Sequence, residues 1–147
     1  MVETGKNTVK ILLIEDTPGD VRLITEGFKR TSLEPQFHVV GDGEQALNIL
    51  LNEESDQAHL PDLILLDINL PLISGHEVLK LIKNNGILKK IPVVILTSSL
   101  LDEDIAKAKA NLADFYVIKP INLDEYFASI LKIERFWRNF QDSKKGY

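Results

Sequence analysis

Five polar residues have the side-chain types that phosphoryl transfer at a metal site requires. Three carboxylates held close together repel one another unless a cation joins them, and oxygen ligands without His or Cys suit Mg²⁺. An ammonium group and a hydroxyl group can both contact a phosphoryl oxygen, and an aspartate such as Asp67 is an accepted nucleophile for phosphoryl transfer. The residues concerned are Glu15, Asp16, Asp67, Thr97 and Lys119.

These residues close short apolar segments that we expect to be β-strands. The segments are continuous rather than alternating in polarity, which is typical of strands covered by helices on both faces. The run Leu63 to Leu66, which ends on Asp67, therefore predicts a buried strand. The predicted strands are residues 9–16, 36–42, 62–67, 91–97 and 115–119.

Longer amphipathic segments lie between the predicted strands, and several carry residues typical of helix starts. The order of strand then helix, repeated along the chain, predicts a parallel sheet with right-handed crossovers in a three-layer α/β domain. The polar segment 52–60 is predicted to be a surface loop before the third strand. The helix-start signals are Thr17 and Pro18 with Asp20, Ser74 with Glu77, and Asn122 with Glu125.

The polar residues are expected to converge because they stand at carboxyl ends of strands. In open α/β sheets that edge forms the crevice where ligands bind. With a strand order of 2-1-3-4-5, the first and third strands are neighbours, so Glu15, Asp16 and Asp67 meet there. Thr97 and Lys119 then lie on the far side of the same pocket. We expect the Asp67 carboxylate to lie at the mouth of the crevice rather than to be buried.

Composition restricts the function further. A chain of 147 residues that is 44% hydrophobic and 27% charged is expected to form one globular domain. It contains no cysteine, so neither a disulfide framework nor a thiolate metal site is available. A net charge of -5 argues against nucleic acid as a partner. Without a long apolar run or a secretory signal, a membrane span is not expected and the cytoplasm is the predicted location.

The sequence resembles the receiver domain of two-component response regulators. The resemblance covers about residues 8–135 and implies a flavodoxin-like fold with strand order 2-1-3-4-5. It also implies that a sensor histidine kinase donates a phosphoryl group from a phosphohistidine to Asp67. We expect the chain to comprise an N-terminal tail at 1–8, a receiver domain at 9–140 with an extended C-terminal helix, and a C-terminal tail at 141–147. The motifs are "ED" (15–16), "LLDINLPLISG" (65–75), "VVILTSS" (93–99) and "YVIKP" (116–120).

The resemblance implies specific roles for individual residues. The metal, Mg²⁺ with Mn²⁺ as an alternative, would be held by the side chains of Asp16 and Asp67, the backbone carbonyl of Asn69, and a water bound by Glu15. Glu-Asp in place of an Asp-Asp pair is a familiar variant that should retain magnesium.

The same likeness makes Thr97 and Tyr116 a switch pair. The hydroxyl moves toward the phosphoryl group and the aromatic ring turns inward behind it. The resemblance also implies a cis bond between Lys119 and Pro120. Asn69 and Ser99 occupy the positions that tune loss of the phosphoryl group.

The last predicted helix, residues 122–140, carries two apolar stripes that one sheet cannot cover together. The first stripe is expected to face the sheet, and the second, with its aromatic residues, predicts a homodimer interface. The alternative is that Trp137 and Phe140 fold back on their own domain. The first stripe is Leu123, Phe127, Ile130 and Leu131; the second is Tyr126, Ile130, Ile133, Trp137 and Phe140.

The short segment beyond the receiver leaves no room for an output domain, so we expect signalling by contact with another protein. The stand-alone layout, the segment before the third strand and the aromatic "IERFWRNF" (133–140) are similar to the small regulators of bacterial phytochromes. A phytochrome histidine kinase is therefore a plausible phosphoryl donor.

Other interpretations remain. A magnesium-dependent phosphohydrolase also uses a strand-end aspartate, but would carry a second acid where this chain has Asn69. A nucleotide- or flavin-binding module would need a glycine-rich first turn in place of "EDTPGD" (15–20). Taken singly, each polar residue could also be an ordinary turn, strand or surface residue, and Tyr116 could simply pack against a helix. His38, His59 and His76 lack ligand spacing and are predicted to be structural or exposed.

Overall fold

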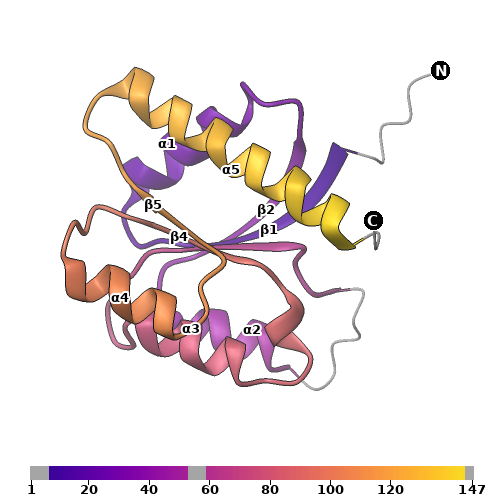
Figure 1. Ribbon diagram of the computed structural model, residues 1–147, viewed down its shortest axis with the longest axis vertical. Helices are drawn as coiled ribbons and strands as arrows, with labels where there is room; N and C mark the ends of the chain where they lie inside the picture. The colour runs from indigo at the N-terminus through magenta and orange to yellow at the C-terminus, as the bar shows by residue number, and fades with distance from the viewer. Residues whose placement is uncertain (1–6, 53–58, 145–147) are drawn as a thin grey trace.

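The computed structural model describes residues 7–52 and 59–144, and within them the chain forms a five-stranded parallel sheet (Figure 1). The strand order is β2-β1-β3-β4-β5, as predicted. Six residues of the predicted loop at 52–60 lie outside the described part. The strands are β1 (Thr8–Ile14), β2 (Glu34–Val40), β3 (Leu63–Leu66), β4 (Val93–Thr97) and β5 (Phe115–Ile118).

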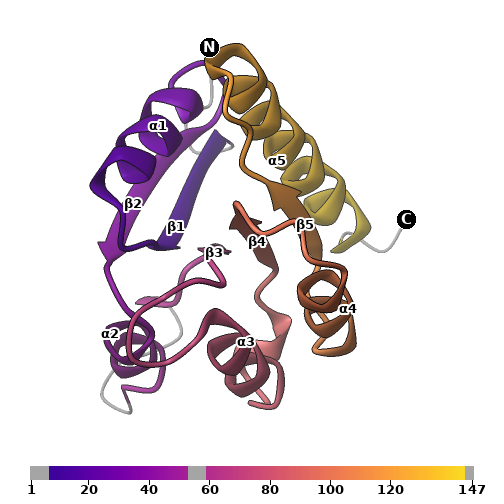
Figure 2. The same cartoon turned by 90° about the vertical axis from the view of Figure 1, so that its left-hand side faces the viewer.

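Helices cover both faces of the sheet and give the predicted three layers (Figures 1 and 2). One face carries α1 (Pro18–Phe28) and α5 (Leu123–Lys144), and the other carries α2 (Gly43–Leu50), α3 (Gly75–Lys83) and α4 (Asp102–Ala110). A 3₁₀ turn, η3 (Leu88–Lys90), precedes β4. Among the helices of the described residues, none has the length and apolar character needed to cross a bilayer.

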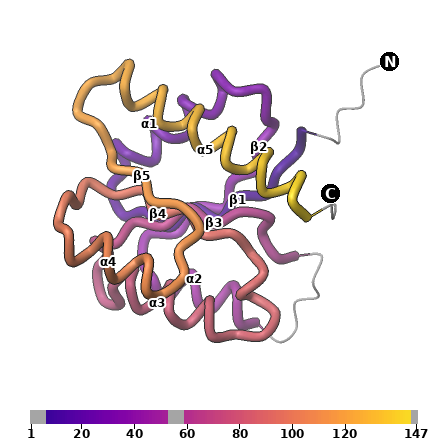
Figure 3. Tube along the Cα trace, viewed as in Figure 1, coloured from indigo at the N-terminus to yellow at the C-terminus, as the bar shows by residue number. Residues whose placement is uncertain are grey.

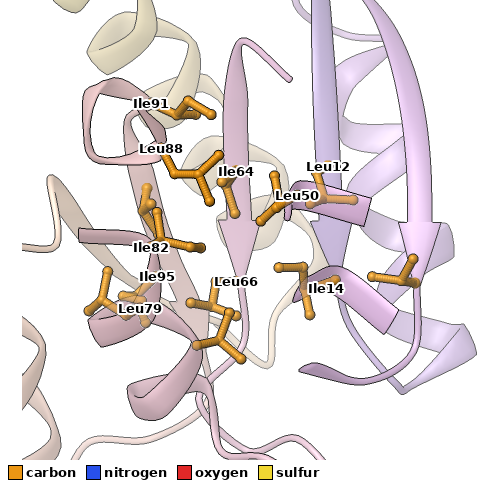
Figure 4. Close-up of a cluster of buried hydrophobic side chains, with 14 of the residues drawn as sticks. Leu12, Ile14, Leu50, Ile64, Leu66, Leu79, Ile82, Leu88, Ile91 and Ile95 are labelled. Carbon is orange, nitrogen blue, oxygen red and sulfur yellow. The ribbon is translucent and has the colours of Figure 1, made fainter. Parts of the chain in front are cut away.

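The central strands are apolar throughout because each of their faces packs against helices. On β1, Leu12 and Ile14 join the core beneath α2 and α3. Ile11 and Leu13, which alternate with them, join the core beneath α1 and α5. Figure 4 shows the first of these clusters, with Ile64 and Leu66 of β3 at its centre. The edge strand β2 departs from the prediction of burial on both faces, since Val40 is the residue of that strand that is buried.

The helix-start residues act largely as their types predict. The Ser74 hydroxyl accepts a hydrogen bond from the Glu77 backbone N–H at 3.2 Å, and the Asn122 side chain accepts one from the Glu125 N–H at 3.1 Å. Thr17 makes no side-chain cap, and α1 instead begins with Pro18 at its first position.

The C-terminal helix buries the other apolar stripe, not the one that was predicted to face the sheet. Tyr126, Ile133 and Trp137 are 3%, 0% and 8% exposed, so the prediction that they form an exposed stripe is wrong. Leu123 and Leu131, which were expected to be covered, are 52% and 43% exposed.

The reason for this reversal is that α5 packs against α1 as well as the sheet (Figure 3). The contact is close, because a Cβ atom at Gly27 would lie 2.7 Å from the Ile130 side chain. The covered stripe is therefore set by α1, which sequence periodicity does not reveal. The helix also continues to Lys144, beyond the boundary predicted at residue 140.

Candidate phosphoryl-transfer and metal site

The acidic residues meet where β1 and β3 end. The two strands pair in register, with Ile14 opposite Leu66, and the Asp67 N–H continues the ladder to the Ile14 carbonyl at 3.1 Å. Parallel strands end at the same edge, so Glu15, Asp16 and Asp67 follow one another around it. Each offers a carboxylate oxygen within 4.8 Å of the others. The predicted convergence of the three acids is therefore present.

Asp67 is buried, which corrects the expectation that it lies open at the crevice mouth. Its residue is 6% exposed, because neighbouring donors close over the carboxylate. One oxygen, Oδ1, accepts hydrogen bonds from the Thr97 hydroxyl at 2.8 Å and from the Asn69 N–H at 3.0 Å. The other, Oδ2, accepts from Lys119 Nζ at 2.9 Å. Glu15 is also buried, whereas Asp16 and Asn69 are exposed.

Lys119 supplies the positive charge of the site. It follows β5, and its N–H binds the Thr97 carbonyl at 2.8 Å, which places its side chain across the carboxyl ends of the sheet. Its Nζ lies 2.5 Å from Glu15 Oε1 and 3.2 Å from Asp20 Oδ2, in addition to its contact with Asp67. Burial alone would lower the pKa of Lys119, but the bonds and charges of Glu15 and Asp67 outweigh burial and raise it.

The peptide bond between Lys119 and Pro120 is not cis as the resemblance implied, since no peptide bond within the described residues is cis. An X–Pro bond prefers trans by about 0.5–1 kcal/mol unless its surroundings favour cis.

The donor set fits a divalent cation. Burial raises the pKa of Glu15 to about 7, although the hydrogen bond from Lys119 opposes this. The charge of the neighbouring Asp67 carboxylate adds to the rise. Carboxylate oxygens without nitrogen or sulfur ligands suit a hard cation such as Mg²⁺ or Mn²⁺. Glu15, Asp16 and Asp67 are the residues that could hold it.

The loop after β3 is held tightly against the site by Gly75. A Cβ atom at this position would overlap the Asp67 carbonyl oxygen, and the Gly75 N–H binds the Ile68 carbonyl at 2.9 Å. Only glycine allows the start of α3 to approach the backbone of the central strand so closely. The loop that contains Asn69 is therefore fixed at both of its ends.

Tyr116 lies near the site, where the charge of Asp67 acts on it. It is half-buried on β5, and its hydroxyl donates to the Ser99 carbonyl at 3.2 Å in the segment before α4. Burial raises the pKa of Tyr116, so the hydroxyl remains a donor. Thr97 stands at the end of the neighbouring strand, opposite Ile118.

Three contacts near the site were not predicted from the sequence. Asp20 Oδ1 accepts a hydrogen bond from the Tyr126 hydroxyl at 3.0 Å, which joins α1 to α5 beside Lys119. On the other face of the sheet, Asp104 of α4 lies 2.9 Å from His76 Nε2 of α3 and accepts from the Ser99 hydroxyl at 2.5 Å. The contacts of Tyr126 with Asp20 and of His76 with Asp104 join residues distant along the chain, and no local sequence signal pairs them.

Comparison with known proteins identifies the family of this chain. A family model described as the response regulator receiver domain matches residues 11–131. The chain is 36% identical over 133 residues to the probable methanogenesis regulatory protein FilR2 of Methanothrix harundinacea, covering 90% of this chain and 86% of that protein. It is 39% identical over 128 residues to the response regulator Rcp1 of Synechocystis, covering 86% and 87%.

Solved structures of response regulators are similar to this chain as well. The phosphorylated cyanobacterial phytochrome response regulator RcpA superposes with a TM-score of 0.82 at 40% identity, covering 88% of this chain and 94% of that chain. The Mn²⁺-bound form of Rcp1 has a TM-score of 0.79 at 38% identity, with the same coverage of 88% and 94%.

Proposed function

Because the chain belongs to the response regulator receiver family, we propose that it accepts a phosphoryl group on Asp67 from a sensor histidine kinase. Receiver proteins of this type are phosphoacceptor signalling proteins rather than conventional enzymes. The observation that carries the assignment to Asp67 is its set of donors. A hydroxyl, a backbone N–H and an ammonium group all converge on this one strand-end carboxylate.

The transfer needs positioning and charge more than covalent chemistry from other residues. A carboxylate oxygen of Asp67 forms a bond to phosphorus while the bond between phosphorus and the donor imidazole nitrogen breaks. The leaving imidazole keeps the electron pair of that bond. Lys119 and Thr97 already contact the carboxylate, so they stand where a phosphoryl group would carry its negative charge.

We assign Glu15, Asp16 and Asp67 to hold Mg²⁺ or Mn²⁺, with the backbone carbonyl of Asn69 as a further ligand. When bound, the cation would neutralise negative charge on the phosphoryl oxygens. The Mn²⁺-bound form of the relative Rcp1 supports a divalent metal in this family. Thr97 and Tyr116 are the proposed switch pair, with the Tyr116 hydroxyl leaving the Ser99 carbonyl when the ring turns inward.

The proposed phosphoryl donor is a phytochrome-type histidine kinase in the cytoplasm. Support comes from RcpA, which is a phytochrome response regulator, and from a bacteriophytochrome response regulator, RtBRR, at 35% identity. FilR2, which is named as a probable methanogenesis regulatory protein, is similar over 90% of this chain. The names of the relatives therefore point to different pathways.

We further propose a homodimer through the outer face of the C-terminal helix. Tyr126, Ile133 and Trp137 are buried in the protomer, so the aromatic surface that we assign to the interface is the half-buried series of Phe115, Phe136 and Phe140. Phe115 and Phe136 stack with ring centroids 5.2 Å apart, and Phe140 follows Phe136 at 6.0 Å. Together with Lys132 and Arg135 these rings line an open groove.

The central test is the intact mass of the protein after incubation with acetyl phosphate and Mg²⁺. We expect one added phosphoryl group on the wild-type protein and none on Asp67→Asn. Asp62→Asn is the matched control, because Asp62 stands at the opposite end of the same strand, where it binds the Lys10 N–H at 2.8 Å. An adduct that persists in Asp67→Asn would overturn the assignment. Repeated hydrolysis of phosphate esters without an adduct would favour a phosphohydrolase.

A further inference from the structure

Tyr126, the first buried residue of α5, is joined to the phosphoacceptor by a continuous series of hydrogen bonds. Asp67 accepts from Lys119 at 2.9 Å, and Lys119 also donates to Asp20 at 3.2 Å. The second oxygen of Asp20 accepts from Tyr126 at 3.0 Å. The series crosses from the centre of the sheet through α1 to α5, and it leaves the site on the face opposite to Tyr116.

Tyr126 is suited to a fixed contact. Its residue is 3% exposed, so a hydroxyl without a partner there would be costly. Burial, reinforced by the charge of Asp20, raises the pKa of Tyr126, so the hydroxyl stays a donor. Asp20 is partly exposed, with 24% of its side chain accessible. Water can therefore replace Lys119 as its partner, whereas Tyr126 has less freedom.

Lys119 has three N–H donors, and in this state three carboxylates already accept them. A phosphoryl group on Asp67 adds negative charge and new acceptor oxygens beside it. These new oxygens compete with the three carboxylates for the donors of Lys119. The contact with Asp20 is the longest of the three, and its carboxylate is the most accessible to water.

We propose that Asp20 and Tyr126 are positioning residues that respond to movement of Lys119. Through them, phosphorylation of Asp67 changes the first turns of α5. The inference rests on the proposed function of Asp67. When Lys119 moves to the phosphoryl group, Asp20 loses the ammonium group that fixes its position. The hydrogen bond from Tyr126 to Asp20 is then less constrained. This route is separate from the Thr97 and Tyr116 pair, which acts toward α4.

Hydrogen exchange of peptides covering residues 123–130 tests the proposal, measured with Mg²⁺ alone and with acetyl phosphate plus Mg²⁺. In wild type we expect exchange in this segment to increase roughly twofold or more on phosphorylation. In Tyr126→Phe and in Asp20→Asn the adduct should still form, but the difference between the two conditions should fall to less than about a third of the wild-type difference. Asp20→Asn provides the test if loss of the buried hydroxyl prevents folding.

Tyr116→Phe is the control, since its hydroxyl contacts the Ser99 carbonyl on the other face, and it should keep the wild-type difference in α5. A purely structural role for Tyr126 would shift exchange equally in both conditions and leave that difference unchanged, which would overturn the proposal. So would a wild-type α5 that exchanges identically in both conditions. Intact mass is measured on the same samples, so absence of the adduct would instead refute the proposed function.

Discussion

Lys119 is the positively charged group that lies between the buried carboxylates of Glu15 and Asp67. Its side chain is 7% exposed, and those of Glu15 and Asp67 are 1% and 7% exposed. Burying charges is costly, and the cost is met only when every charge has a partner. Without a bound metal, Lys119 is therefore a structural as well as a functional residue.

Lys119→Met should destabilise the metal-free protein by about 3 kcal/mol, because the acids lose their buried partner. Addition of Mg²⁺ should restore much of this loss, since the ion supplies the missing positive charge and binds the folded state. Urea denaturation with and without Mg²⁺ measures both effects.

Lys83 provides the matched control for this prediction. Its side chain is 8% exposed and its Nζ lies 2.8 Å from Asp114, away from the acidic site. Lys83→Met should also lower the free energy of unfolding, but Mg²⁺ should not restore it. If Mg²⁺ restored both variants equally, the stabilisation would not arise from the acidic site.

At the scale of elements, the junction of β3 and α3 depends on Gly75. Because a Cβ atom would overlap the Asp67 carbonyl oxygen, Gly75→Ala must displace either the loop or the strand end. We expect a loss of about 2–3 kcal/mol in stability together with slower formation of the adduct. Gly86→Ala is the control, as no atom lies within 4 Å of its added Cβ, and its stability should change by less than about 0.5 kcal/mol. Equal effects of the two substitutions would contradict the close approach.

A second contact at this scale joins α3 to α4 through His76 and Asp104. It makes the free energy of unfolding depend on pH in the acid range. The hydrogen bond from Ser99, and then the contact with His76, hold the pKa of Asp104 below its ordinary value of 3.8. The folded state thus binds this proton less tightly than the unfolded chain does. The carboxylate stabilises the fold above the unfolded value of 3.8, and the contribution is lost as the pH falls through the lower pKa of the folded state.

Asp104→Asn should therefore be less stable than wild type at about pH 6, and the difference should shrink as the pH is lowered below about 4. Chemical denaturation across this range measures it, and Ser99→Ala should reduce the same pH dependence in part. A difference between wild type and Asp104→Asn that stays constant with pH would contradict the role of the carboxylate.

At the scale of the whole molecule, the parts predicted from sequence are those that topology determines. Asp67, Thr97 and Lys119 could be placed together because each closes a parallel strand, and such strands end at one edge. The face of α5 that is buried could not be predicted, because the helix carries two apolar stripes and packing against α1 selects between them. The contact of Tyr126 with Asp20 spans 106 residues, and no local pattern encodes it.

The two faces of α5 should respond differently to truncation of an aromatic side chain. Trp137 is 8% exposed in the core between α5 and the sheet, so Trp137→Ala should lower the free energy of unfolding by about 3–4 kcal/mol. Phe140 is only half-buried on the outer groove. Phe140→Ala should cost less than about 1.5 kcal/mol but should weaken the proposed dimer.

Sedimentation at tens of micromolar, before and after phosphorylation, reports the effect on assembly, and urea denaturation reports the effect on stability. A wild-type protein that stays monomeric in both states would refute the dimer. A dimer unaffected by Phe140→Ala would instead place the interface away from this groove, because loss of a ring at a contact surface removes apolar area that the partner would otherwise cover.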